Sequence, residues 1–158
     1  MTLEQTSPIK PEETTVLLAE DDPNDVLITR IMFRKARLAN RLQVVRDGEQ
    51  TIAYLEGRGR YADRIAYPRP ILLLLDLKMP KISGFEVLEW MQEQPPSEHV
   101  PVAVLTSSTH DPFAERAFQL GADSYLVKPP TPHELLALVE RLHAYWMIVG
   151  QESDLQPA

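Results

Sequence analysis

Five short apolar runs recur along the chain, and each of them ends at polar or turn-forming residues. The runs cover residues 16–19, 42–45, 71–75, 100–106 and 124–127. Their apolar residues are largely consecutive rather than alternating with polar ones, which is typical of strands that are buried on both faces. The pattern therefore predicts five strands of a parallel sheet, with the longest aliphatic run ("ILLLL") at residues 71–75.

Helical patterns fill the intervals between these runs and follow the last one. The predicted helices cover residues 24–38, 48–57, 83–94, 111–120 and 132–148. We expect Asn24 or Asp25 to cap the first helix, with Pro23 closing the preceding turn. Residues 58–70 ("RGRYADRIAYPRP") are polar and contain prolines, so a loop is predicted there. The apolar residues that we expect to turn the last helix toward the core are Leu135, Val139, Leu142 and Trp146.

The alternation of strands and helices predicts an α/β fold, namely a three-layer α/β/α sandwich around one parallel sheet. In such sheets, ligands bind outside the carboxyl ends of the strands. The chain of 158 residues is long enough to bury one core, with 44% hydrophobic and 25% charged residues.

Charge and composition narrow the classes of function. The net charge of −7 argues against DNA binding, because phosphate contacts need clustered Lys and Arg. The sequence has no cysteine, which excludes disulfides, zinc thiolates and thiol catalysis. No apolar run approaches the roughly 20 residues that span a bilayer, and no signal peptide is recognisable, so we expect no membrane contact and a cytoplasmic location.

Reactive or ligating side chains follow four of the five apolar runs. They are Glu20, Asp21 and Asp22 after the first run, Asp76 after the third, Thr106, Ser107 and Ser108 at the end of the fourth, and Lys128 after the fifth. Because the carboxyl ends of parallel strands meet at one edge of the sheet, these groups are expected to converge. Crowded carboxylates repel one another, and a hard cation that takes oxygen ligands, such as Mg²⁺, would relieve that repulsion.

With a cation bound, Asp76 could act as a nucleophile toward a phosphoryl group, with Lys128 and the Thr106 hydroxyl contacting the phosphoryl oxygens. Ser107 is small and leaves room for that group. A single acid after a strand is more often a solvated turn residue or a helix cap, and Asp22 and Asp25 can be explained in that way. The combination of suitable groups at four strand ends favours the chemical interpretation.

The motifs "LLAEDDP", "LLLLDLKMP", "VLTSS" and "SYLVKP" resemble those of response regulator receiver domains over residues 14–148. The resemblance implies a flavodoxin-like sheet of order 2-1-3-4-5. It leaves residues 1–13 as an extension and residues 149–158 as a short tail, with no output domain expected. The "GRGRYADRIAYPRP", "NDVLITRIMFRKA" and "AYW" segments further resemble the stand-alone regulators of phytochrome-type kinases.

The resemblance also implies a role for each matching residue. Asp76 would be the phosphoacceptor, and Mg²⁺ would be bound by Asp21, Asp76, Glu20 and the backbone carbonyl of Lys78. Thr106, Lys128 and Ser107 would contact the phosphoryl group. Lys78 and Ser108 would tune dephosphorylation, and Tyr125 would be an aromatic switch. Ser83-Gly84 replaces the family's Asp-Gly, with Gly84 expected to keep the backbone freedom, and the peptide after Lys128 could be cis.

The expected partners are a phytochrome-type sensor histidine kinase and a histidine phosphotransfer protein. We also expect a homodimer, because more apolar side chains gather near the chain end than one helix face can bury. The candidate dimer residues are Phe113, Tyr145, Trp146 and Met147. The protein would then be a signalling receiver, not an enzyme, apart from self-catalysed phosphotransfer and autodephosphorylation.

Three alternatives are disfavoured by particular residues. A haloacid-dehalogenase-like phosphatase would need a second Asp where Lys78 stands. A flavodoxin-like cofactor binder would need a Gly- and hydroxyl-rich loop where Glu20, Asp21 and Asp22 stand. A receiver scaffold that is not phosphorylated is disfavoured because Asp76, Asp21, Thr106 and Lys128 are all present.

Overall fold

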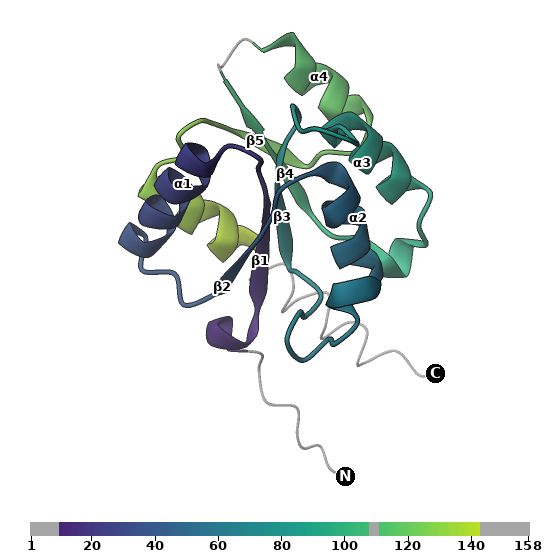
Figure 1. Cartoon of the computed structure of the whole chain (residues 1–158). Coiled ribbons are helices and arrows are strands. Elements are labelled where there is room, and N and C mark those ends of the chain that lie inside the picture. Colours follow the sequence, from purple (N-terminus) through teal and green to yellow (C-terminus); the bar gives the residue numbers. More distant parts are fainter. Residues whose placement is uncertain (1–9, 108–110, 143–158) are drawn as a thin grey trace, which may run out of the picture.

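Five parallel strands form one sheet in the order β2-β1-β3-β4-β5 (Figure 1). The structure, a computed structural model, describes residues 10–107 and 111–142. The strands are β1 (Thr15–Ala19), β2 (Arg41–Val45), β3 (Leu72–Asp76), β4 (Val102–Thr106) and β5 (Ser124–Val127). The predicted α/β class, the parallel sheet and the strand order are confirmed.

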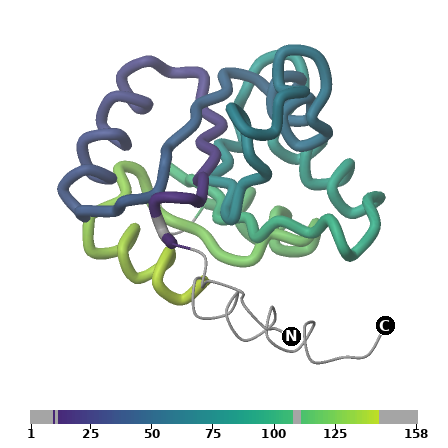
Figure 2. Tube along the Cα trace, turned by 90° about the horizontal axis from the view of Figure 1, so that it is seen from below, coloured from purple at the N-terminus to yellow at the C-terminus, as the bar shows by residue number. Residues whose placement is uncertain are grey.

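Helices cover both faces of this sheet, as Figure 2 shows from below. The helices are α1 (Pro23–Lys35), α2 (Gly48–Glu56), α3 (Gly84–Gln92), α4 (Pro112–Gln119) and a last helix over residues 132–142. Helix α1 and the last helix lie on one face, and α2, α3 and α4 lie on the other (Figures 1 and 2). Short 3-10 helices are η2 (Pro11–Glu13), η3 (Gly59–Tyr61) and η4 (Pro96–Glu98).

The consecutive apolar residues of the central strands supply two separate cores. Successive strand side chains point to opposite faces of a sheet. Leu17 and Leu73 therefore pack in the core beneath α2 and α3, whereas Leu18 and Leu74 pack in the core beneath α1 and the last helix. All four are fully buried. This double burial fixes the central strands, and with them the positions at which β1 and β3 end.

The start of α1 differs from the prediction. Asp22, not Asn24 or Asp25, is the N-cap, and its side chain accepts a hydrogen bond from the Asn24 backbone N–H at 2.8 Å. Pro23 does not close a turn but occupies the first helical position, where its missing N–H costs nothing and its fixed φ suits the helix. The helix ends at Lys35, three residues before the predicted end.

The last helix follows its predicted apolar pattern as far as the structure describes it. Leu135 and Val139 are buried, and Leu142 packs against the same core. Trp146, which was expected on this face, lies outside the described residues. Within the described part of the chain, no helix is long and apolar enough to cross a membrane.

Residues 58–70 are more ordered than a predicted polar loop. The rings of Tyr54, Tyr61 and Tyr67 pack together, with centroid separations of 5.0 to 6.0 Å. The Arg64 guanidinium donates hydrogen bonds to the carbonyls of Leu55 and Tyr67, at 2.9 and 3.0 Å. Burial raises the pKa of the Tyr54 hydroxyl to about 12, and this hydroxyl donates to the Pro68 carbonyl at 2.9 Å. These contacts tie the segment to the end of α2.

Gly84 is required for a reason other than the predicted backbone freedom. The left-handed residue in the turn after β3 is Lys81, with a φ of 67°. Gly84 instead lies against the end of β3, where an added Cβ would stand 2.7 Å from the Asp76 carbonyl oxygen and from the Leu77 Cα. Both neighbours are backbone atoms and cannot rotate away.

We predict that Gly84→Ala destabilises the protein by about 1–3 kcal/mol, because the methyl group overpacks the junction of α3 and β3. Urea denaturation followed by circular dichroism measures the change. Glu89→Ala, on the exposed side of the same helix, is the control and is expected to stay within about 0.5 kcal/mol. Equal stabilities of the two variants would contradict the steric role of Gly84.

Candidate functional site

Four strand ends place the predicted site residues at one edge of the sheet. Asp76 is the last residue of β3 and lies opposite Leu105 in the register with β4. Thr106 ends β4, and its carbonyl accepts a hydrogen bond from the Lys128 backbone N–H at 2.8 Å. Glu20 follows β1 directly, with its own N–H donating to the Val45 carbonyl at 3.0 Å. The predicted convergence at this edge is therefore observed.

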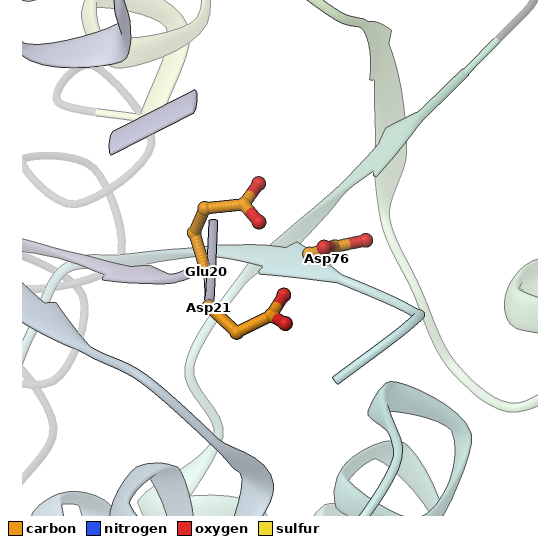
Figure 3. Close-up of side chains that lie close together, drawn as sticks. All are labelled: Glu20, Asp21 and Asp76. Carbon is orange, nitrogen blue, oxygen red and sulfur yellow. The ribbon is translucent and has the colours of Figure 1, made fainter. Parts of the chain in front are cut away.

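Three carboxylates form a tight cluster there. Glu20, Asp21 and Asp76 each offer a carboxylate oxygen, and these oxygens lie within 4.8 Å of one another. Figure 3 shows the carboxylates of Glu20 and Asp21 on the side of the strand end that faces Asp76. Glu20 and Asp76 are buried, whereas Asp21 is exposed. The cluster is thus open to solvent on the side of Asp21.

The Lys128 ammonium lies among the acids and pairs with two of the cluster's carboxylates. Its Nζ is 2.8 Å from Glu20 Oε1 and 3.2 Å from Asp76 Oδ2. The second oxygens are also used, since Glu20 Oε2 accepts from the Asp22 N–H at 3.2 Å and Asp76 Oδ1 accepts from the Lys78 N–H at 3.1 Å. These bonds fix the orientation of both buried carboxylates.

A further acid, Asp25, belongs to the site, although its place at the start of α1 is also that expected of a helix cap. Its Oδ2 lies 3.3 Å from Lys128 Nζ. The signal that could have found it is its position in the first turn of α1, a helix that begins beside the end of β1.

Crowding changes the proton affinities of the buried groups. Burial raises the pKa of Glu20 from 4.5 to about 7, and the neighbouring Asp76 carboxylate raises it too, while Lys128 opposes the rise. Burial lowers the pKa of Lys128, but its contacts with Glu20 and Asp76 outweigh burial and raise the value above that of a free lysine. The lysine therefore remains a cation, and the acids carry more negative charge than it can balance.

The donor set fits a hard divalent cation. Mg²⁺ prefers oxygen ligands and is commonly held by one or two carboxylates together with water. Here Asp21 and Asp76 offer carboxylate oxygens near Glu20, and the exposed side of Asp21 leaves room for water. A cation would also offset the repulsion between the Glu20 and Asp76 carboxylates. The contribution of the Lys78 carbonyl stays a prediction.

Other predicted residues lie around this cluster. The side chain of Lys78 is exposed, and its ammonium stands 5.7 Å from the centre of the Phe113 ring. Ser107 is exposed, and its hydroxyl lies 3.5 Å from an Asp111 carboxylate oxygen. Tyr125 is 41% exposed and packs edge-on against Phe118, so its ring is turned outward rather than inward. The peptide between Lys128 and Pro129 is cis.

Several predicted residues lie outside the described part of the chain. They are Ser108, Tyr145, Trp146 and Met147. Phe113 is the described member of the candidate dimer surface. It is 43% exposed and contacts the Phe85 ring at a centroid distance of 5.8 Å.

Comparison with known proteins agrees with this geometry. The family model of the response regulator receiver domain matches residues 16–140. Response regulator Rcp1 of Synechocystis sp. is 31% identical over 132 residues, which cover 84% of this chain and 88% of Rcp1. The probable methanogenesis regulatory protein FilR2 of Methanothrix harundinacea is 35% identical over 135 residues, or 84% of this chain and 83% of that protein.

Solved structures are also similar. Response regulator RPA3017, in red light signalling of R. palustris, is 36% identical, with a TM-score of 0.72 over 85% of this chain and 94% of that one. The phosphorylated cyanobacterial phytochrome response regulator RcpA is 29% identical, with a TM-score of 0.67 over 85% and 94%. The Mn²⁺-bound form of Rcp1 is 31% identical, with a TM-score of 0.64 over 84% and 94%.

We predict that Asp21→Asn weakens Mg²⁺ and Mn²⁺ binding, because it replaces a solvent-facing carboxylate of the cluster with a neutral amide. Loss of an outer partner of a metal ligand costs roughly 10–100-fold in affinity, so loss of a direct ligand should cost at least about tenfold. Isothermal titration calorimetry measures the affinity.

Asp22→Asn is the matched control for this experiment. It removes the same charge one residue away, and asparagine caps a helix about as well as aspartate. We expect its metal affinity to stay within about twofold of wild type, since surface charge effects are small. Equal losses in the two variants would show that Asp21 acts only through general charge.

Proposed function

This chain belongs to the response regulator receiver domain family, and on that basis we propose that it receives a phosphoryl group from a histidine kinase on Asp76. The observation that carries the proposal is the position of the Asp76 carboxylate. It ends a buried strand, 3.2 Å from the Lys128 ammonium and within 4.8 Å of the Glu20 and Asp21 carboxylates.

In the proposed reaction, a carboxylate oxygen of Asp76 attacks the phosphorus of a phosphohistidine. A P–O bond forms, the P–N bond breaks, and the imidazole nitrogen keeps the electron pair and takes a proton. Phosphoryl transfer depends mainly on positioning and on charge neutralisation. The hydrogen bond from the Lys78 N–H to Asp76 Oδ1 leaves the other carboxylate oxygen beside Lys128, available for this attack.

The cofactor of the proposal is Mg²⁺, held by Asp21, Asp76, Glu20 and the carbonyl of Lys78. When bound, Mg²⁺ supplies positive charge that neutralises the phosphoryl oxygens. The proposal draws support from the oxygen cluster of this chain and from the Mn²⁺-bound form of the relative Rcp1.

The other site residues act on the phosphoryl group itself. Lys128 would donate to one phosphoryl oxygen and Thr106 to another, while Ser107 leaves space beside them. Lys78 and Ser108 would set the rate at which water removes the group. The chain is then a signalling receiver rather than an enzyme with a separate substrate, since only transfer to Asp76 and hydrolysis from it are proposed.

We expect phosphorylation of Asp76 to change the surface formed by α4 and β5. We propose that Thr106 moves toward the phosphoryl group and that the Tyr125 ring, now turned out against Phe118, turns inward. Such a switch shifts a population between two packings and does not create a new fold. Helix α4 and strand β5 would carry the change to partners.

The proposed kinase is of the phytochrome type and the proposed location is the cytoplasm. Support comes from the relatives, which include a phytochrome response regulator whose structure is of the phosphorylated form and a regulator in red light signalling. A histidine phosphotransfer protein is the proposed alternative donor or acceptor. The chain spans most of the length of these relatives.

We predict that the protein forms a homodimer through the surface of Phe113, Tyr145, Trp146 and Met147. Phe113, Phe118 and Tyr125 are each at least 41% exposed, so burying this side of the molecule would remove aromatic surface from water. Sedimentation equilibrium with and without beryllofluoride measures the mass. A monomer at micromolar and higher concentrations under both conditions would refute the dimer.

We predict that acetyl phosphate and Mg²⁺ label the wild-type protein, and that Asp76→Asn is not labelled. The amide of asparagine is close in shape to the carboxylate but is not a nucleophile toward phosphorus. Intact-protein mass spectrometry detects the added phosphoryl group, which should survive acid and be lost in base.

Asp22→Asn serves as the control, because it keeps the cap of α1, and we expect it to be labelled. Peptide mapping after borohydride reduction locates the acyl phosphate. An unlabelled wild-type protein, or undiminished labelling of Asp76→Asn, would refute the assignment of the phosphoacceptor.

A further inference from the structure

The Lys128 ammonium contacts three carboxylates, and the third comes from a helix that has no assigned part in the chemistry. Its Nζ lies 2.8 Å from Glu20, 3.2 Å from Asp76 and 3.3 Å from Asp25. The side chains of Glu20 and Asp76 are only 1% and 8% exposed, whereas that of Asp25 is 36% exposed. Asp25 is therefore the most exposed of the three carboxylates that contact the lysine.

These three carboxylates share a single ammonium group. An ammonium group has three N–H donors and no acceptor. A phosphoryl oxygen that approaches Asp76 from solvent must take over one of these donors. The contact with Asp25 is the longest of the three and the most exposed, so it is the one that can be given up at the lowest cost.

We propose that Asp25 is a positioning residue for the reaction at Asp76, which holds the Lys128 ammonium toward α1 and competes with phosphoryl oxygens for it. This inference rests on the proposed function. A phosphodonor such as acetyl phosphate is an anion, so a carboxylate beside the lysine weakens its binding by repulsion as well as by occupying a donor.

A purely structural role does not account for the contact. An acid in the first turn of a helix is favourable on its own, because it faces the positive end of the helix dipole. However, the cap of α1 is already made by Asp22, and Asp25 Oδ2 is directed at Lys128, 103 residues further along the chain. The contact joins α1 to the loop after β5, directly beside the phosphoacceptor.

The first measurement tests the contact between Asp25 and Lys128 in the absence of phosphorylation. Trace labelling of amines with acetic anhydride, followed by mass spectrometry, gives the reactivity of Lys128 relative to the exposed Lys35. In Asp25→Asn we expect Lys128 to react about two- to fivefold faster, the size expected for losing a partly exposed ion pair. Asp22→Asn removes the same charge from the same end of α1 and should leave this ratio unchanged.

The second measurement tests how the loss of the Asp25 carboxylate changes phosphoryl transfer to Asp76. With Mg²⁺ and increasing acetyl phosphate, we expect Asp25→Asn to lower the KM by about two- to fivefold, with the maximal rate within about twofold of wild type. The difference should shrink at high salt, because salt screens a charge that is partly exposed. A merely structural role would alter stability without this split between KM and maximal rate.

These experiments test the role of Asp25 separately from the role of Asp76 as phosphoacceptor. Unchanged Lys128 reactivity in Asp25→Asn, or a KM equal to that of Asp22→Asn, would overturn the positioning role while leaving Asp76 as phosphoacceptor. An unlabelled wild-type protein would overturn the proposed function and, with it, any part of Asp25 in phosphoryl transfer. Faster Lys128 labelling together with a lower KM that is specific to Asp25→Asn would support the proposal.

Discussion

The ion pair between Lys128 and the buried Glu20 carboxylate is the interaction on which the rest of the site depends. A buried charge is costly unless it is paired and hydrogen-bonded, and here one ammonium serves three acids at distances of 2.8 to 3.3 Å. The net charge of these acids and Lys128 is still negative, so the site attracts a further cation. The same lysine faces Asp76 and can follow negative charge that arrives there. A single side chain thereby offsets part of the charge of the buried acids and also lies beside Asp76.

The position of this pair follows from the sheet. Glu20 and Asp76 end β1 and β3, two neighbouring strands whose side chains are buried on both faces. Interiors are close-packed, so the ends of such strands have little freedom to move. Gly84 shows how tight the junction is, because even a methyl group there would collide with the backbone of Asp76 and Leu77. The close packing of the core therefore fixes the positions of Glu20 and Asp76.

Much of this arrangement could be predicted from the sequence, because it depends on patterns that are local. Consecutive aliphatic residues predicted buried parallel strands, and the polar residues after them predicted where Asp76 and Lys128 would meet. What was missed depends on direction in space. The cap of α1 is an exception, because Pro23 favours the first helical position and so indicates from the sequence that Asp22 is the cap. The contact from Asp25 to Lys128 and the packing around Tyr54 join segments that no local pattern relates.

The tyrosine cluster around residues 58–70 limits how substitutions in that segment can affect the site. This segment precedes β3 and so lies at the amino-terminal edge of the sheet, while Asp76 ends the same strand at the opposite edge (Figure 1). Tyr54, Tyr61 and Arg64 hold the segment through contacts with one another and with the end of α2. A substitution in this segment can therefore reach Asp76 only through the core that Tyr54 and Tyr61 share with β3.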